Sequence, residues 1–402
     1  MRKISLFGYG KTTKAIANRV KNCQIFDDSV EKTIQKDGHN IYPSSQFNPQ
    51  ESSLEIPSPG IPPYNNMIKR AKNLVSDYDF FLGDRNEQFS IWISGTNGKT
   101  TTTKMLGHLL KDRGGIIGGN VGMPLAELKN GYIYILETSS YTLHYTNIAK
   151  PNIYLLLPLS DDHVNWHGSF KEYENAKLKP LKFLKEGEVA ILPEEYKDIK
   201  TDGYKITYKD GKDLAQYFGI DFKRVNFQEP FLLDAIMALG VTKILFDEID
   251  YKMINSFKID PHRLEEIRDK RDRLWVNDSK GTNIHATIQA IKRYEDKRIY
   301  LILGGDDKGA DLEPLFKELE RLNLTIYATG SNKDKIAKLS KKIKKDVKKF
   351  NNIQDIVNDI DKFLQIDEVA LLSPAASSLD QYSSYKERGE LFKKSILLLD
   401  RK

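Results

Sequence analysis

The feature that most limits how this chain can fold is a glycine loop at residues 93–102, which reads ISGTNGKTTT. An apolar run, residues 89–93, leads directly into the loop, and a helical pattern from about Lys99 to Lys111 follows it. A strand, a glycine turn and a helix in this order can bind phosphate, because loop N–H groups and the helix N-terminus face the anion. The loop is shorter than usual, since Ile93 stands where the first glycine of the common pattern would be.

We therefore predict a nucleoside triphosphate site at this loop. Lys99 is expected on the terminal phosphates, and the Thr100 hydroxyl can ligate magnesium. A later strand, residues 133–137, ends at Glu137, whose carboxylate would lie beside the loop in a parallel sheet and hold the same ion. A surface acid at the strand end is the alternative interpretation of Glu137. The predicted loop contacts are Gly95, Thr96, Asn97, Gly98, Lys99, Thr100 and Thr101.

Two histidines follow in residues 159–168, which read LSDDHVNWHG. His163 and His167 have the spacing of a zinc pair on a helix, but no glutamate follows His163 and Gly168 closes the segment. We expect a loop in which His163 is a magnesium ligand and His167 lies near the surface. Residues 169–172, SFKE, form a capping-box pattern and predict a helix that carries Lys177.

The N-terminal segment has a weaker nucleotide-binding pattern. A strand at residues 4–7, a Gly-Tyr-Gly turn, a helix over about residues 12–20 and a short strand ending at Asp27 resemble the opening of a βαβ unit. Asp27 or Asp28 could hold a ribose hydroxyl, or be an ordinary turn residue. Residues 58–63, SPGIPP, predict a rigid turn, which could also be a plain linker. Cys23 falls in an apolar run and reads as a buried strand thiol.

Length and composition indicate an α/β protein of several domains. A chain of 402 residues suggests two or three domains, and strands alternating with helical segments after residue 261 predict a mainly parallel sheet. Basic residues exceed acidic ones by only 6, and the run at residues 341–345 fits a solvated helix face better than a nucleic-acid surface. We expect a monomer with no membrane insertion and no nucleic-acid partner. Because one cysteine suits a reducing compartment, we expect the protein to be cytoplasmic.

Several motifs occur together in an order that resembles the Mur ligases, the ATP-dependent amide-forming enzymes of peptidoglycan synthesis. The resemblance spans almost the whole chain and is closest to the D-glutamate-adding branch of the family. The motifs are GTNGKTTT at 95–102, GNVG at 119–122, ETSS at 137–140, DH at 162–163, AKL at 176–178, PHRLE at 261–265, NDSKGTN at 277–283, GGDDK at 304–308 and SPAASSLDQY at 373–382.

The resemblance implies three domains, residues 1–87 for the UDP-precursor, 88–260 for ATP and 261–402 for the amino acid. The outer two would be Rossmann-like and the central one a phosphate-loop domain. The implied substrates are ATP, UDP-N-acetylmuramoyl-L-alanine and D-glutamate, joined through an acyl phosphate and a tetrahedral intermediate. Because residues far apart in the chain must meet, the domains are expected to close on their ligands.

Roles for individual residues follow from the same resemblance. Lys99, His163 and Lys177 would be catalytic, and Thr100, Glu137, His163 and Lys177 would surround two magnesium ions, Lys177 as a carbamate formed with carbon dioxide. The implied ATP contacts beyond the loop are Arg263, Asn277 and Asp278. The implied contacts of the precursor and the amino acid are Lys11, Thr12, Asp27, Ser58, Gly60, Asn120, Lys280, Thr282, Lys308, Ser378, Leu379 and Tyr385.

The sequence departs from the family at residues 227–235, FQEPFLLDA, where members usually carry a His-Asn pair and a further Asn. Gln228 is a candidate replacement for the adenine contact. Another Mur-type ligase, a folylpolyglutamate synthase-like ligase, a P-loop kinase or NTPase, and a nucleotide sensor without turnover are the alternative functions. The phosphate loop and Glu137 alone would suit the kinase, but the C-terminal motifs would then need a separate explanation.

Overall fold

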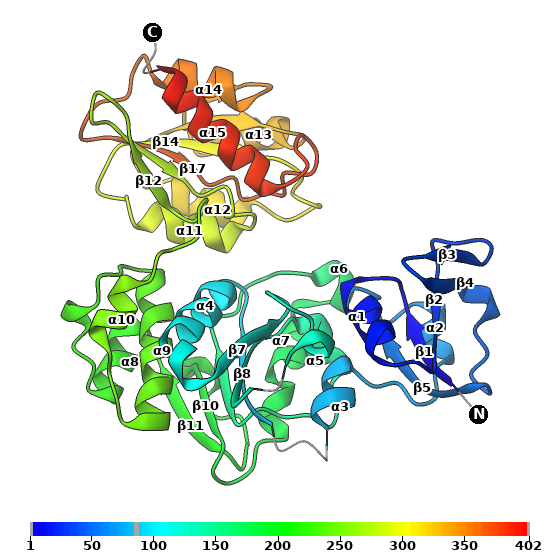
Figure 1. Cartoon of the computed structure of the whole chain (residues 1–402). Helices are drawn as coiled ribbons and strands as arrows, with labels where there is room; N and C mark the ends of the chain where they lie inside the picture. Colours follow the sequence, from blue (N-terminus) through cyan, green and yellow to red (C-terminus); the bar gives the residue numbers. More distant parts are fainter. Residues whose placement is uncertain (1–2, 84–87, 130, 400–402) are drawn as a thin grey trace. The chain divides into compact units, whose positions relative to one another are not determined.

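The computed structural model describes residues 3–83, 88–129 and 131–399 and shows an α/β protein built on three sheets (Figure 1). The chain divides into two compact units, Met1–Phe257 and Lys258–Lys402. The first unit contains two separate sheets and the second contains one. The α/β prediction is therefore confirmed, while the expected boundary after residue 87 lies outside the described residues.

The first sheet has the strand order β3-β4-β2-β1-β5, and only β3 runs antiparallel to its neighbour. Its elements are β1 (Lys3–Phe7), α1 (Lys11–Arg19), β2 (Cys23–Asp27), β3 (Ile34–Lys36), β4 (His39–Pro43), β5 (Ser52–Pro57) and α2 (Asn66–Arg70). Successive residues of β1 bury opposite faces: Leu6 packs with Ile16 of α1, and Phe7 packs with Phe47. Cys23 lies in β2 as predicted but is only partly buried.

The second sheet is parallel throughout, with the order β11-β10-β9-β6-β8-β7. Its strands are β6 (Phe89–Ser94), β7 (Gly115–Gly119), β8 (Ile133–Glu137), β9 (Ile153–Leu156), β10 (Val189–Pro193) and β11 (Tyr204–Tyr208). The helices around it are α3 (Asp77–Leu82), α4 (Lys99–Leu109), α5 (Ser140–Tyr145), α6 (Val164–His167), α7 (Phe170–Leu178), α8 (Gly211–Phe218), α9 (Phe231–Phe246) and α10 (Tyr251–Ser256). Continuous burial along β6 and β8 is typical of parallel strands covered on both faces.

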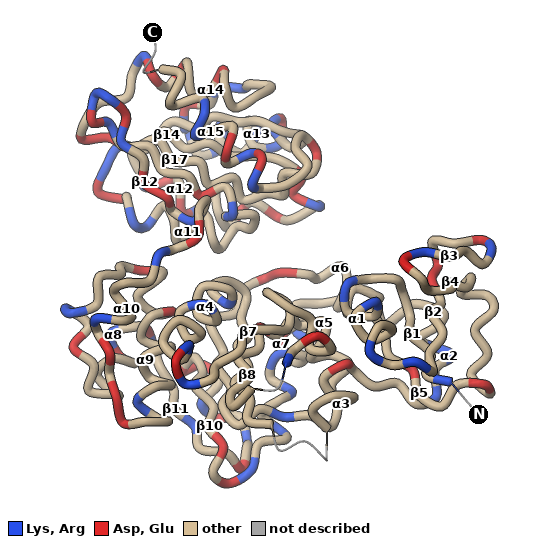
Figure 2. Tube along the Cα trace, in the orientation of Figure 1, with Lys and Arg blue, Asp and Glu red and all other residues tan. Residues whose placement is uncertain are grey.

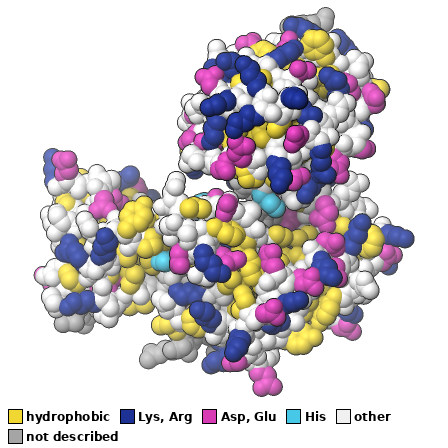
Figure 3. Space-filling model, turned by 180° about the vertical axis from the view of Figure 1, so that it is seen from behind, with side chains coloured by type: hydrophobic (Ala, Val, Ile, Leu, Met, Phe, Trp, Pro, Cys, Tyr) yellow, Lys and Arg dark blue, Asp and Glu magenta, His cyan; other side chains and the backbone are white. Residues whose placement is uncertain are grey.

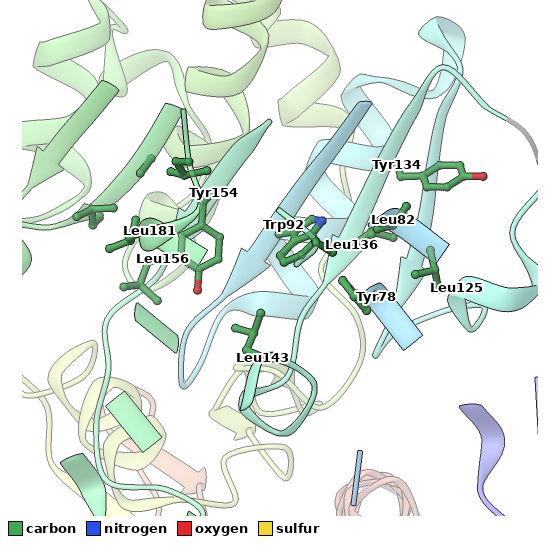
Figure 4. Close-up of a cluster of buried hydrophobic side chains, with 14 of the residues drawn as sticks. Tyr78, Leu82, Trp92, Leu125, Tyr134, Leu136, Leu143, Tyr154, Leu156 and Leu181 are labelled. Carbon is green, nitrogen blue, oxygen red and sulfur yellow. The ribbon is translucent and has the colours of Figure 1, made fainter. Parts of the chain in front are cut away.

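A large apolar cluster packs α3 and other segments against this central sheet (Figure 4). Trp92 of β6 is fully buried and meets the Tyr78 ring edge to face, with 4.8 Å between centroids. Tyr78 and Leu82 come from α3, so this helix packs into the core of the central sheet. Aromatic pairs of this kind add about 1 kcal/mol beyond the burial of their area.

The second unit has the order β12-β13-β17-β14-β15-β16. Its strands are β12 (Glu265–Arg268), β13 (Leu274–Asn277), β14 (Ile299–Gly304), β15 (Leu324–Thr329), β16 (Val347–Lys349) and β17 (Val369–Leu372), and its helices are α11 (Ile284–Lys292), α12 (Glu313–Leu319), α13 (Lys333–Lys342), α14 (Ile353–Ile360) and α15 (Tyr385–Leu399). The predicted alternation of strands and helices in a mainly parallel sheet is confirmed, and β12 is an antiparallel edge strand. Because β13 and β14 lie on either side of β17, the loops after these three strands meet at one edge of the sheet.

Basic and acidic residues are interspersed along the trace in both units (Figure 2), and both signs are mixed on the face drawn in Figure 3. Lys341 and Lys342 end α13 and are exposed, whereas Ile336 and Leu339 of the same helix are buried. The prediction of a solvated helix face is thus confirmed. Among the residues that the structure describes, none of the helices is both long and apolar enough to cross a bilayer.

Candidate active site

The glycine loop joins β6 to α4 through two backbone positions that favour glycine. Gly95 has φ of +141°, and a Cβ there would lie 2.5 Å from the Leu157 side chain. Gly98 has φ of +82° and caps α4, which begins at Lys99. The backbone therefore turns directly into a helix N-terminus, as anion binding requires.

Lys99 lies across this loop. Its Nζ donates hydrogen bonds to the carbonyl oxygens of Gly95 and Thr96, both at 2.7 Å. The ammonium therefore lies against the backbone of the loop, and its role on the terminal phosphates stays a prediction.

Glu137 lies next to the loop because β8 pairs with β6, and its register partner is Ile93. The carboxylate is buried and accepts hydrogen bonds from Thr100 Oγ1 at 2.8 Å and from Asn120 Nδ2 at 2.6 Å. Three predicted site residues from three segments therefore meet here. In the described part of the chain no group of three His, Cys, Asp or Glu side chains could hold a metal. One carboxylate beside a hydroxyl and a phosphate loop nevertheless fits magnesium, which keeps waters and substrate oxygens as ligands.

Lys177 reaches the base of the same loop from α7, whose N-cap Ser169 accepts the predicted hydrogen bond from Glu172 N–H at 3.1 Å. The lysine is only 1% exposed, and its Nζ donates to Ser94 Oγ at 3.1 Å and to the Gly95 carbonyl at 3.0 Å. Burial, and then the positive charge of Lys99, lower the pKa of Lys177 well below its ordinary value. The neutral amine, which is the form that reacts with carbon dioxide, is therefore favoured.

His163 lies at the rim of the loop. Its Nδ1 is 2.6 Å from the Tyr141 hydroxyl, and its Nε2 is 3.4 Å from the Asp162 carboxylate. The ring also lies 6.2 Å from that of Tyr173, whose hydroxyl is 2.8 Å from Thr96 Oγ1 in the phosphate loop. The imidazole is half exposed and fits the role of a ligand at the edge of the site.

The expectation for the segment after His163 was wrong in two respects. Residues Val164–His167 form the short helix α6 rather than a loop. His167 is buried, because the rings of Tyr141, Trp166 and Tyr173 surround it. Burial lowers the pKa of His167 to about 4, and its Nε2 lies 2.9 Å from Ser140 Oγ.

Asp234 is a buried neighbour of the loop that was not predicted. It lies in the first turn of α9, and its Oδ1 accepts a hydrogen bond from Thr102 Oγ1 at 2.9 Å. A Cβ added to Gly98 would lie 2.5 Å from the same oxygen. The pair is separated by 132 residues, so no local spacing could have indicated it. Gln228, the candidate adenine contact, precedes α9 and stays a prediction.

The predicted precursor contacts of the first sheet gather where β1, β2 and β5 end. Asp27 Oδ2 accepts the Tyr9 N–H at 2.5 Å, and a Cβ on Gly10 would lie 2.7 Å from Ser58 Oγ. Lys11 begins α1 and donates from Nζ to the Gly122 carbonyl at 2.7 Å.

The remaining residues of this group have the following positions. Thr12 lies in the first turn of α1, and the Gly60 carbonyl accepts a hydrogen bond from Trp166. Asp28, the alternative to Asp27, accepts a hydrogen bond from Asn65 Nδ2 at 2.6 Å. Asp27 is thus the aspartate that contacts the glycine turn.

In the second unit the predicted residues lie on the loops at one sheet edge. Lys280 places its Nζ 4.4 Å from the centre of the Tyr385 ring. Lys308 follows β14 on an exposed turn, and its N–H donates to Asp306 at 2.9 Å. Ser378 and Leu379 follow β17, the serine buried and the leucine 66% exposed. Thr282 lies on the Lys280 loop, where its N–H donates to the Lys280 carbonyl.

The predicted ATP contacts of this unit lie at the same edge of the sheet, where β13 ends. Asn277 ends β13, and its Nδ2 lies 2.9 Å from His262 Nδ1 and donates to the Gly389 carbonyl at 3.2 Å. Asp278 accepts hydrogen bonds from Ser373 Oγ at 2.7 Å and from the Leu264 N–H at 3.3 Å. Burial raises the pKa of Asp278 to about 7. Arg263 precedes Leu264 and lies 4.0 Å from Asp260.

Arg388 of α15 organises this edge and was not predicted. The side chain is 1% exposed and donates to the carbonyl oxygens of Ser279 at 2.9 Å, Gly304 at 3.4 Å and Ala376 at 3.2 Å. The Ser279 and Ala376 carbonyls lie in the loops after β13 and β17, and Gly304 is the last residue of β14, where the third loop begins. A single guanidinium thus connects the three loops that carry the predicted amino-acid contacts.

Comparison with known proteins agrees with this arrangement. The model of the Mur ligase middle domain matches residues 93–229, and that of the Mur ligase glutamate ligase domain matches residues 262–376. A UDP-N-acetylmuramoylalanine–D-glutamate ligase of Campylobacter jejuni is 51% identical over 401 residues, which cover 98% of this chain and 99% of the relative. The chain belongs to the Mur ligase family.

Two other matches of this Mur ligase extend the comparison. A Helicobacter pylori UDP-N-acetylmuramoylalanine–D-glutamate ligase is 43% identical over 98% of the chain and 99% of its own length. The crystal structure of MurF ligase from Thermotoga maritima in complex with ADP superimposes with a TM-score of 0.61, covering 99% of this chain and 96% of that one. The identity of the two chains is 16%, so this likeness shows the shared Mur ligase fold.

Proposed function

We propose that this Mur ligase adds D-glutamate to UDP-N-acetylmuramoyl-L-alanine at the expense of ATP, in the synthesis of the peptidoglycan precursor. The observation that carries the proposal is the 51% identity, over nearly the full length of both chains, to a relative named for this reaction. The grouping of Thr100, Asn120 and Glu137 beside the phosphate loop supports the ATP-dependent step.

The reaction needs activation because a carboxylate is a poor electrophile. ATP transfers its terminal phosphoryl group to a carboxylate oxygen of the precursor, and the bond to ADP breaks. The amine of D-glutamate then attacks the carbonyl carbon of the acyl phosphate and forms a tetrahedral intermediate. Loss of a proton from nitrogen and departure of phosphate leave the amide.

The residues of the loop have roles that follow from their positions. Lys99 and the N–H groups at the start of α4 bind the terminal phosphates, and the cationic side chain offsets the charge that develops during transfer. Thr100 and Glu137 would hold a first magnesium ion and His163 would help to hold a second, and these ions would neutralise phosphate charge. Asn120 orients the Glu137 carboxylate through its 2.6 Å hydrogen bond.

Lys177 is proposed to act as a carbamate at a second magnesium site. Its burial favours the neutral amine, and capture of carbon dioxide would convert it into an anionic oxygen ligand. Because Nζ lies 3.0 Å from the Gly95 carbonyl, such an anion would form at the base of the phosphate loop.

We propose one substrate for each of the three sheets. The corresponding domains would be residues 1–87, 88–260 and 261–402. The first sheet binds the UDP end of the precursor through its carboxyl edge, and the second unit binds D-glutamate. Lys280 and Lys308 suit the two carboxylates of that amino acid. The full set of proposed contacts is Lys11, Thr12, Asp27, Ser58, Gly60 and Asn120 for the precursor, Arg263, Asn277 and Asp278 for ATP, and Lys280, Thr282, Lys308, Ser378, Leu379 and Tyr385 for D-glutamate.

The proposal is tested by phosphate release from ATP and magnesium in the presence of UDP-N-acetylmuramoyl-L-alanine. D-Glutamate, L-glutamate, L-alanine and meso-diaminopimelate are compared as acceptors. Release and amide product with D-glutamate alone are expected. Phosphate release with a different acceptor would assign the chain the substrate of another Mur-type ligase. No phosphate release with any of the four acceptors, despite ATP binding, would contradict the ligase proposal. The proposal also includes a cytoplasmic, monomeric enzyme, which fractionation and sedimentation would test.

A further inference from the structure

We propose that Tyr145 and Trp166 are positioning residues that dock the turn at residues 58–63 onto the central sheet, and so align the bound precursor with the phosphate loop. This inference rests on the proposed function, because it concerns how that precursor is placed. It assigns a role to two aromatic side chains that take no part in the chemistry described above.

Both side chains bind consecutive carbonyl groups of the turn. The Tyr145 hydroxyl donates to the Ile61 carbonyl at 2.7 Å, and Trp166 Nε1 donates to the Gly60 carbonyl at 3.1 Å. Tyr145 is 4% exposed, so its hydrogen bond is shielded from water. The two rings also contact each other, with 5.9 Å between their centroids. The two donors therefore form one paired attachment point for the turn.

The turn is stiff enough to transmit that position. Pro59, Pro62 and Pro63 fix three backbone φ angles, and the Ile61 N–H closes the turn by donating to the Ser58 carbonyl at 3.0 Å. The Ile61 side chain of this turn packs against the glycine turn that follows β1. A Cβ on Gly8 would lie 2.9 Å from Ile61 Cδ1. Residues 58–63 consequently move together with the carboxyl edge of the first sheet.

The other end of the connection reaches the loop that carries the proposed magnesium ligand. The Trp166 ring lies 4.6 Å from that of Tyr141 at an angle of 36°, and the Tyr141 hydroxyl is 2.6 Å from His163 Nδ1. A short path of four side chains therefore joins the turn to the rim of the phosphate loop.

Alignment matters because the precursor is long and its two ends serve different purposes. The UDP end is held at the first sheet, whereas the reacting carboxylate must lie in line with the terminal phosphate of ATP. A displacement of about 1 Å at a reacting centre is enough to slow catalysis substantially. Two hydrogen bonds from α5 and α6 to the turn would fix the distance between the two binding regions.

Substitutions that remove one hydrogen-bond donor each test the proposal. Tyr145→Phe removes only the hydroxyl, and Trp166→Phe removes the N–H while keeping an aromatic ring. Each variant is expected to raise KM for the UDP-precursor roughly fivefold, and the double variant roughly twentyfold or more, because one hydrogen bond is lost at each site. The KM values for ATP and D-glutamate should stay within about twofold. Tyr134→Phe is the matched control, since its hydroxyl donates at 3.1 Å to the Lys129 carbonyl, away from the turn.

A second readout does not depend on turnover. Hydrogen–deuterium exchange of a peptide spanning residues 57–66 should be faster in the two variants than in the wild type and the Tyr134→Phe control. Unchanged precursor KM and unchanged exchange in both variants, with an active wild type, would overturn the docking role and leave the proposed function intact. A wild type without D-glutamate-dependent phosphate release would overturn the proposed function, and exchange alone would then decide whether the turn is docked.

Discussion

The phosphate loop and the loop edge of the second unit both hold predicted substrate contacts in place, but they do so by different means. The first is one continuous segment, in which Gly95, Gly98, Lys99 and Thr100 are set in place by a strand and the helix that follows it. The second is assembled from loops after β13, β14 and β17, and Arg388 connects them from a helix 109 residues beyond Ser279. Local backbone geometry therefore defines one site, whereas a long-range buried cation defines the other.

The largest expected effect concerns the phosphate-loop side of this comparison. Lys177→Ala should lower kcat roughly a thousandfold, because it removes the group proposed to hold the second magnesium. Short carboxylic acids should restore part of the activity, since they can stand in for a carbamate. Steady-state phosphate release measures both effects.

Lys171→Ala is the control for that variant. Lys171 lies in the same helix, is 71% exposed and forms only a surface ion pair with Glu174, so activity should be unchanged. Full activity of Lys177→Ala without added acid would remove Lys177 from the mechanism.

Arg388→Met should have the next largest effect, this time on the second unit. Three buried carbonyl oxygens would lose a charged donor, and we expect a loss of roughly 3 kcal/mol in unfolding free energy. Surviving folded protein should also show a raised KM for D-glutamate, because the loops after β13, β14 and β17 are no longer tied. Denaturant unfolding and substrate titration measure the two effects.

Arg321→Met provides the comparison for Arg388. Its guanidinium is 60% exposed and pairs only with Glu295 and Glu318, so a change within about 0.5 kcal/mol is expected. Equal stability of the two variants would show that Arg388 does not organise the loop edge.

Gly98→Ala tests the local character of the phosphate loop. A Cβ at φ of +82° costs about 1 kcal/mol, and its 2.5 Å approach to Asp234 Oδ1 adds roughly another 1 to 2 kcal/mol. Gly187→Ala has a similar φ of +87° with nothing within 4 Å of the new Cβ, so it should show the backbone cost alone. Melting temperatures separate the two terms, and calorimetry with ATP should show weaker binding only for Gly98→Ala. Identical behaviour of the two variants would mean that the Asp234 contact is unimportant.

The same contrast explains what could be predicted from the sequence. The strand–helix alternation after residue 261 could be predicted because β13, β14, β15 and β17 are short apolar runs between turn residues. Glu137 was placed because a strand end is visible in the sequence. Asp234 and Arg388 were missed because their partners are more than a hundred residues away. The burial of His167 was missed because its aromatic surroundings come from α5, α6 and α7, and no local pattern records that packing.

Asp278 gives the smallest predicted effect and the clearest dependence on pH. Its folded pKa of about 7 lies above the ordinary value of 3.8, so the native state binds this proton more tightly than the unfolded state. Stability from this group is therefore complete below about pH 4 and is lost as the pH rises towards 7. Between pH 5.5 and 8 the expected loss is about 2 kcal/mol.

Asp278→Asn isolates that contribution, because an amide can still accept the hydrogen bond from Ser373 Oγ but does not titrate. The difference in melting temperature between wild type and variant should favour the variant more at pH 8 than at pH 5.5, by several degrees. A difference that is the same at both pH values would show that Asp278 is already ionised in the folded protein. The buried edge would then hold a carboxylate within the electrostatic influence of the Arg388 guanidinium, and the second unit, like the phosphate loop, would depend on charge.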